Sequence, residues 1–327
     1  MIDSSRSVPT ERVLALARLA PLQVLSAEEL SLIALAGREE VVTRRTVLVA
    51  AGERPEALYV PLSGELGITG AAASRRNAAA ENPARAAALA LLGQMPLAVN
   101  LIAPAGTTLL IVPRDSLLAL LEERGQLSRN LLAALASRLR AWGHVGGPTF
   151  RVSSGPLSRR TDLFSRMLVF RKILGPGGSG MVAVARLARV ARELRLEPGV
   201  TFAPAADQPD VLVVMQGSLR FLRTDGTEHL ARAGEVVGLV EAVAGLPFAR
   251  EATALASTAV LALSAPELAE AIQDEDLLCL DLVRGFAAEL AALETGSLPF
   301  PERDTSKEVT CSPPATTALG PTARRSS

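Results

Sequence analysis

The chain has 327 residues, of which 49% are hydrophobic and 3% aromatic, and its 34 basic residues equal its 34 acidic ones. This length allows about two domains. A net charge of zero lacks the basic surplus with which nucleic-acid-binding proteins neutralise phosphates, and scarce aromatic side chains argue against a stacking surface for single strands. Cys279 and Cys311 are the only cysteines, so no disulfide framework is expected.

No segment has the roughly 20 apolar residues of a membrane-spanning helix. The most apolar window, residues 86–103, is interrupted by Gln94, Pro96 and Asn100. The first ten residues lack the apolar core of a signal peptide. We therefore expect a cytoplasmic protein with no membrane insertion.

Residues 1–142 form the first half, which begins with helical patterns and continues into short segments bounded by Gly and Pro, typical of strands. Residues 71–86 show neither the periodicity of a helix nor that of a strand, and they are predicted to be a flexible loop insertion. The last helix carries a stripe of Leu131, Leu135 and Leu139, typical of a core or of a dimer interface. The predicted elements are a helix at 11–20, a helix after a capping box at 26–29, strands at 46–50, 57–62, 65–69 and 109–112, and helices at 113–121 and 127–142.

The same order of elements returns in the second half. Residues 143–162 are rich in Gly, Pro and Ser and are predicted to be a linker. Residues 163–293 form the second half, and the Pro-, Ser- and Thr-rich residues 294–327 are predicted to be a disordered tail. The predicted elements are a helix at 181–194, strands at 211–215 and 218–223, a hairpin turn at 225–226, a capping box at 264–267 and a helix at 277–293.

Short motifs align the two halves. Residues 57–64 match 210–217, and residues 91–96 match 243–247. The spacing, near 150 residues, is the size of a whole domain rather than of a solenoid repeat. Evenly spaced short strands with flanking helices favour a fold that is mainly β, built as two tandem β jelly-roll domains.

The second half also carries Pro198-Gly199, Gly217 and Gly234-Glu235. With these glycines and the flanking helices, each half resembles the cyclic-nucleotide-binding domain of the catabolite activator family and of protein kinase A regulatory subunits. The resemblance covers residues 11–142 and 163–293. It implies a cassette whose short helix receives a cyclic phosphate at its N-terminal amides, with a Glu for the ribose hydroxyl and an Arg for the phosphate.

The first half departs from this pattern at both charged anchors. Ala88 stands where the family has the Glu, and Leu97 stands where it has the Arg. We therefore expect no cyclic nucleotide in the first half.

The second half departs from the pattern at the Glu position and by a two-residue insertion within residues 247–253. Leu239 replaces the Glu, but Arg250 is a candidate for the phosphate-binding Arg. The candidate ligand-binding residues are Gly238, Arg250 and Thr253, for a cyclic nucleotide or related phosphate ligand. Alternatively, Arg250 is a surface arginine that pairs with Glu251 or Glu241.

No pattern indicates catalysis. His144 and His229 lie far apart with no acidic or cysteine cluster at ligand spacing, so we expect neither an enzyme nor a metal or other cofactor. The residues after Leu293 are too few for the winged helix-turn-helix of the family's DNA-binding members, so no direct DNA binding is expected. The sequence favours a non-catalytic regulatory protein with a ligand-sensing second domain. The alternative is a scaffold of degenerate domains that binds a protein partner, or a homodimer formed through the terminal helices.

Overall fold

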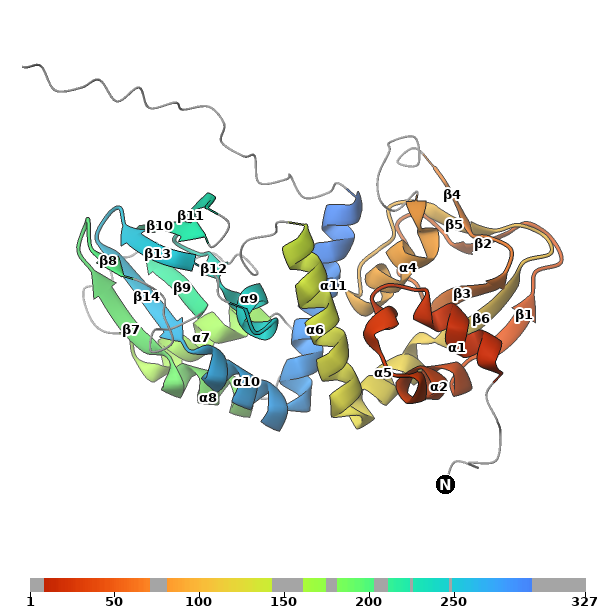
Figure 1. The fold of residues 1–327 in the computed structure, drawn as a ribbon, viewed down its shortest axis with the longest axis horizontal. Helices are drawn as coiled ribbons and strands as arrows, with labels where there is room; N and C mark the ends of the chain where they lie inside the picture. The colour runs from red at the N-terminus through yellow and green to blue at the C-terminus, as the bar shows by residue number, and fades with distance from the viewer. Residues whose placement is uncertain are drawn as a thin grey trace, which may run out of the picture.

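The computed structural model shows two β units separated by a layer of helices (Figure 1). The fold expected from the sequence, mainly β with flanking helices in two tandem jelly-roll domains, is confirmed. The structure describes residues 9–70, 81–142, 161–174, 181–202, 211–223, 226–246 and 249–295.

The first β unit contains two antiparallel sheets of three strands, ordered β1-β6-β3 and β2-β5-β4. Its strands are β1 (Arg38–Val41), β2 (Thr46–Val49), β3 (Ala57–Ser63), β4 (Gly67–Thr69), β5 (Asn100–Ala103) and β6 (Thr108–Pro113). Its helices are α1 (Thr10–Ala17), the 3-10 turn η1 (Leu22–Val24), α2 (Ala27–Leu35), α4 (Pro83–Leu92), α5 (Arg114–Glu123) and α6 (Gly125–Ala141).

The second β unit repeats this strand order and extends each sheet by one strand, as β12-β9-β14-β7 and β11-β10-β13-β8. Its strands are β7 (Arg192–Leu196), β8 (Thr201–Phe202), β9 (Val211–Gln216), β10 (Ser218–Arg223), β11 (Glu228–Arg232), β12 (Val236–Val237), β13 (Ala249–Ala254) and β14 (Thr258–Leu263). Its helices are α7 (Leu163–Leu174), α8 (Met181–Val190), α9 (Leu239–Val243), α10 (Ala265–Asp274) and α11 (Asp276–Thr295).

One glycine–threonine contact occurs in both units and shows the repeat at the level of single residues. Gly64 and Gly217 follow equivalent strands with φ values of +77° and +78°. A Cβ on Gly64 would lie 3.0 Å from Oγ1 of Thr107, and one on Gly217 would lie 2.5 Å from Oγ1 of Thr258. Both the left-handed backbone and the close approach therefore require glycine at these turns.

Two capping boxes expected from the sequence are confirmed. Ser26 accepts a hydrogen bond from the backbone N–H of Glu29, and the Glu29 carboxylate accepts one from the backbone N–H of Ser26. Ser264 and Glu267 make the same reciprocal pair at the start of α10. Each pair satisfies two N–H groups that a helix leaves without partners.

Several element boundaries differ from the sequence-based prediction. The helix predicted for 181–194 ends at Val190, because residues 192–196 pair with β14 and place Leu194 and Leu196 against a sandwich core. The end of the predicted loop 71–86 is helical, since α4 begins at Pro83; residues 71–80 lie outside the described part. The last helix continues to Thr295.

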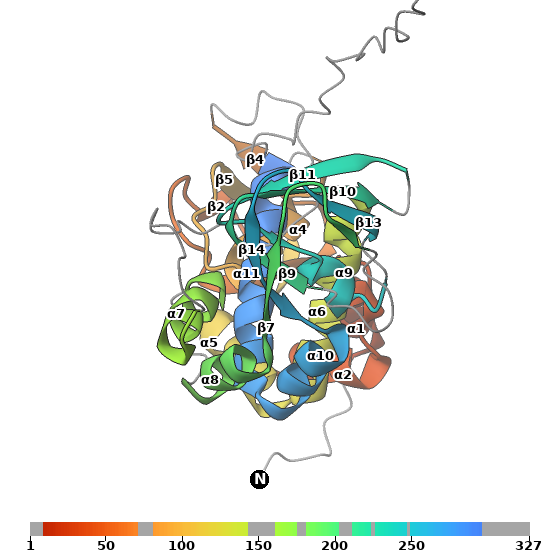
Figure 2. The same ribbon diagram turned by 90° about the vertical axis from the view of Figure 1, so that its left-hand side faces the viewer.

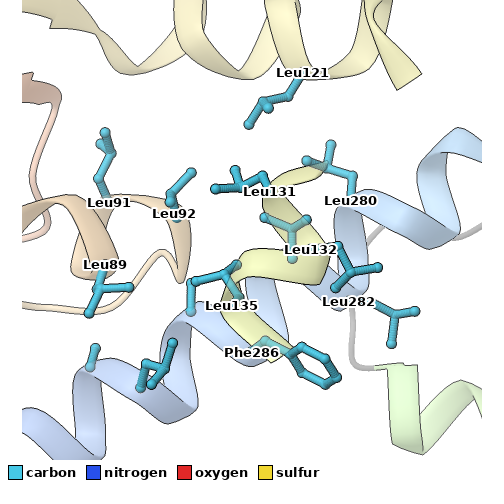
Figure 3. Close-up of a cluster of buried hydrophobic side chains, with 14 of the residues drawn as sticks. Leu89, Leu91, Leu92, Leu121, Leu131, Leu132, Leu135, Leu280, Leu282 and Phe286 are labelled. Carbon is cyan, nitrogen blue, oxygen red and sulfur yellow. The ribbon is translucent and has the colours of Figure 1, made fainter. Parts of the chain in front are cut away.

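The helices α6 and α11 run parallel through the centre of the molecule (Figures 1 and 2). Arg129, early in α6, contacts Asp276 at the start of α11, and Arg138, near the end of α6, contacts Glu294 at the end of α11. The stripe of Leu131, Leu135 and Leu139 is at most 1% exposed and belongs to the main core cluster. Figure 3 shows Leu131 and Leu135 in this core. This leucine stripe is therefore core, and a second copy has no access to it.

Candidate functional site

The cassette of the second unit starts at Gly238, between β12 and α9. Gly238 precedes α9 with a φ of +81°, which strongly favours glycine. The next residues, Leu239 and Val240, are 4% and 0% exposed. The residue in the family's Glu position, Leu239, is thus part of the core.

Arg250 lies at an irregularity of β13. Leu222 of β10 pairs with Glu251, and the next residue, Arg223, pairs with Ala249, so Arg250 is the extra residue of a β-bulge. Bulges redirect a side chain and recur beside functional sites. The side chain of Arg250 is outside the described part of the structure, and its role in ligand binding stays a prediction.

Thr253 lies on the other sheet from the strand that leads into Gly238. Its Oγ1 is 3.0 Å from Oγ1 of Thr201 on β8 and 3.5 Å from Oε1 of Glu251. Within the described residues no hydrogen bond joins Thr253 to Gly238. The two candidates therefore reach a common ligand only if that ligand spans from α9 to β13.

The acidic residues near the cassette have distinct environments. Glu235 accepts a hydrogen bond at 3.0 Å from the backbone N–H of Arg232, and it thereby stabilises the turn in which it lies. Glu241, which the sequence offers only as a pairing partner for Arg250, is 1% exposed on α9. A carboxylate within the apolar run 239–243 is the sequence signal that marks Glu241, because glutamates are seldom fully buried unless they are paired.

The equivalent helix of the first unit, α4, is filled with apolar side chains. Eight of its ten residues are buried. Ala88 and Leu97, which occupy the positions of the family's charged anchors, are 1% and 3% exposed. A Cβ on Gly93 would lie 2.6 Å from the backbone N of Ala288, so α11 sits directly on the end of α4. This half offers apolar packing where a phosphate would need charge.

The terminal helices pack reciprocally across the two units. α6 of the first unit contacts α9 of the second, and α11 of the second contacts α4 of the first. Figure 3 shows α4, α6 and α11 meeting through leucine side chains. A cavity of about 160 Å³ lies where α6, α9 and α10 meet, with Leu132, Val243 and Ile272 in its wall.

The chain that enters the second unit is anchored by Glu193 on β7. Glu193 accepts hydrogen bonds from the backbone N–H of Thr161 at 2.6 Å and from Nε of Arg195 at 2.9 Å. Burial raises the pKa of this carboxyl, but the hydrogen bonds outweigh burial and leave the pKa below its usual value of 4.5. The ionised form is the one that holds this junction.

Within residues 9–295, apart from the gaps given above, no three His, Cys, Asp or Glu side chains are grouped to hold a metal ion. In the same part of the chain, no helix combines the length and the apolar character needed to span a bilayer.

No protein-family model matches the chain, and no curated protein matches it. Among solved structures, the regulatory domain of Toxoplasma gondii PKA, solved with cAMP, is 15% identical; the match covers 88% of this chain and 97% of that one, with a TM-score of 0.29. The sensor domain of the transcriptional regulator DNR from Pseudomonas aeruginosa is 14% identical, with 42% and 95% covered and a TM-score of 0.33.

A third similar structure is the N-terminal domain of a transcriptional regulator from Streptomyces coelicolor A3(2). It is 27% identical, the match covers 33% of this chain and 80% of that one, and the TM-score is 0.28.

Proposed function

We propose that this protein is a non-catalytic regulatory protein, in which the second unit senses a cyclic nucleotide or related phosphate ligand and the helix pair α6–α11 passes the change to the first unit. The observation that carries the proposal is the reciprocal packing of α6 on α9 and of α11 on α4. Because the cassette helix of one unit packs on the terminal helix of the other, a ligand that moves the cassette helix would also move a helix of the other unit.

The ligand would be held by Gly238 at the start of α9 and by Arg250 at the bulge of β13. A ligand shifts a conformational equilibrium only by its difference in affinity for the two states. Two positions of α9 against α6 would supply that difference. The cavity of about 160 Å³ between α6, α9 and α10 leaves space into which α9 can move.

The first unit would serve as the receiving half. Its cassette helix α4 is buried between β3 and α11 and carries no charged anchor. Apolar side chains at positions 88 and 97 offer no hydrogen bond to a phosphate or a ribose. This supports a single ligand site per chain.

Isothermal titration with cyclic AMP, cyclic GMP and cyclic dinucleotides tests the proposal. We expect saturable heat at one site per chain. Arg250→Ala should weaken the affinity roughly ten- to a hundredfold, the effect of losing a charge-assisted hydrogen bond. Arg192→Ala is the matched control, because Arg192 is exposed on β7 of the other sheet. Equal losses in both variants would contradict the role of Arg250.

Absence of heat with every nucleotide would leave the second candidate function, a scaffold of degenerate domains. The buried apolar α4, which has Ala88 where the family has the ribose-binding Glu, supports this candidate. Affinity capture from cell lysate, followed by mass spectrometry, would then be expected to return a specific protein. A monodisperse monomer that captures no partner would count against the scaffold.

A further inference from the structure

Two neighbouring helices of the second unit expose large apolar side chains. α7 and α8 lie side by side (Figure 2), and Nη1 of Arg166 on α7 donates a hydrogen bond at 2.8 Å to the carbonyl oxygen of Ala191, just after α8. The start of α7 therefore lies beside the end of α8, and the two helices are antiparallel. Phe164 and Val182 are 67% and 68% exposed. The exposed large apolar residues of this α7–α8 face are Leu163, Phe164, Leu168, Met181 and Val182.

The packing of the core does not account for these side chains. Each helix already buries another apolar face, with Val169 and Phe170 of α7 and Val184 and Leu187 of α8 in the main core cluster. Single apolar side chains on a surface are ordinary, but several gathered on adjacent helices mark a site of interaction with another protein or with a membrane. The charge of the α7–α8 face distinguishes between these two partners.

The α7–α8 face lies in a segment with an excess of positive charge, although the net charge of the whole chain is zero. Asp162 is exposed, and it accepts a hydrogen bond at 2.7 Å from the backbone N–H of Ser165 at the start of α7. Residues 161–192 contain this one acidic residue and six basic ones, Arg166, Arg171, Lys172, Arg186, Arg189 and Arg192. Arg171 and Arg189 are exposed, and within the described residues neither of them forms an ion pair. Their charges are therefore available to an anionic partner.

Basic and apolar side chains share the outward side of each helix. Arg171 and Lys172 follow Leu168 by about one turn of α7, and Arg189 follows Val182 by about two turns of α8. Because the helices are antiparallel, the basic end of α7 lies beside the apolar start of α8, and the basic end of α8 lies beside the apolar start of α7.

An anionic lipid bilayer matches this combination of side chains. Apolar side chains enter the boundary between headgroups and acyl chains, while Lys and Arg are attracted to the anionic headgroups. A second copy of the chain would bring the same excess of positive charge to the face, and facing like charges oppose association. The observations therefore favour a lipid surface over a homodimer.

We propose that the α7–α8 face is a docking surface for an anionic lipid bilayer. Phe164 and Val182 enter the interfacial layer, and Arg171, Lys172 and Arg189 lie against the headgroups. The protein then rests on the bilayer through two helices whose other faces stay in the protein core. No helix needs to cross the membrane, and none within the described residues is long and apolar enough to do so.

Sedimentation of the full-length protein with vesicles tests the charged part of the face. We expect binding to phosphatidylcholine vesicles that contain phosphatidylserine, little binding to phosphatidylcholine alone, and weaker binding as salt is raised. Arg171→Gln with Lys172→Gln should weaken the affinity by about tenfold or more. The matched control is Arg44→Gln with Arg45→Gln, another adjacent exposed basic pair, in the turn between β1 and β2. Absence of binding to the anionic vesicles, or equal losses in the two pairs, would overturn the proposal.

A second pair of variants tests the apolar part. Phe164→Ser with Val182→Ser should weaken vesicle binding, whereas Leu14→Ser with Val41→Ser, at positions more than half exposed in the first unit, should not. Analytical ultracentrifugation without vesicles provides the opposing outcome, because a dimer that only Phe164→Ser with Val182→Ser dissociates would assign the face to a second copy. Neither experiment contains a nucleotide, and Arg250→Ala should bind the vesicles as wild type does. Failure here is therefore distinct from failure of the proposed function.

Discussion

Arg138 and Glu294 join the far ends of α6 and α11. Nε and Nη2 of Arg138 lie 3.3 and 3.2 Å from Oε1 of Glu294, and the other carboxylate oxygen accepts a hydrogen bond at 3.1 Å from Nε of Arg85, on α4. The Glu294 side chain is fully buried. One carboxylate of the second half thus holds two helices of the first.

Removal of one arginine should destabilise the folded protein strongly. Arg138→Gln leaves the buried Glu294 carboxylate with a single cationic partner, and we expect a loss of about 3 kcal/mol in the free energy of unfolding. Urea unfolding followed by circular dichroism measures this loss. In the double variant Arg138→Gln/Glu294→Gln the penalty should shrink, because no under-compensated charge stays buried. Strictly additive losses would show that the two side chains do not interact.

The contact between α4 and α11 depends on Gly93. Gly93→Ala would place a methyl group 2.6 Å from the backbone N and 2.7 Å from Cα of Ala288, so the two helices must separate. The midpoint of thermal unfolding should fall by several degrees, the shift typical of a loss of about 1 kcal/mol or more. The matched control is Gly285→Ala, within α11, where a Cβ meets nothing within 4 Å. That variant should be neutral or stabilising, by up to about 1 kcal/mol. A Gly93→Ala protein as stable as wild type would contradict the close approach.

The Glu193 junction predicts a stability that depends on pH. The pKa of Glu193 is below its usual 4.5 in the folded protein. Its stabilising contribution is therefore complete well above 4.5 and is lost as the pH falls through 4.5 toward the lower folded-state pKa. Glu193→Gln should destabilise the protein by about 1 kcal/mol at neutral pH, and the difference from wild type should shrink in acid. Urea unfolding of both proteins at neutral pH and in acid measures the difference in the free energy of unfolding. A difference that grows in acid would contradict the lowered pKa.

Cys279 should be unreactive in the folded protein. Burial in the core raises the pKa of its thiol to about 12, so almost no thiolate forms at neutral pH. In a Cys311→Ser variant, a maleimide should label less than a tenth of the native chains over a period that labels unfolded chains fully. Mass spectrometry measures the labelled fraction. Rapid labelling of the native protein would place Cys279 at the surface.

Much of the fold could be predicted from the sequence, because short sequence motifs determine where many of its helices and turns begin. The capping boxes at Ser26 and Ser264 and the glycines at 64 and 217 act over a few residues, and the structure confirms their elements. The strand at 192–196 was missed, since its pairing partner β14 lies more than 60 residues further along the chain. A local sequence pattern cannot indicate a pairing strand that lies so far along the chain.

The candidate site was predictable only in part. The departures at Ala88 and Leu97 could be recognised from the sequence, and the structure places both side chains in the core. The bulge at Arg250 could not, because it arises from the register between β10 and β13. Nor could the partners of Glu294, since Arg85 precedes it by 209 positions and Arg138 by 156.

The parallel pairing of α6 with α11 has a consequence for symmetry. Two identical chains joined through such a seam would present two identical cassettes, and every substitution would appear in both. Here a single chain supplies both helices, so each half can change independently of the other. The two cassettes are indeed unlike: α4 is buried by apolar packing, whereas α9 begins after a glycine in the left-handed backbone region.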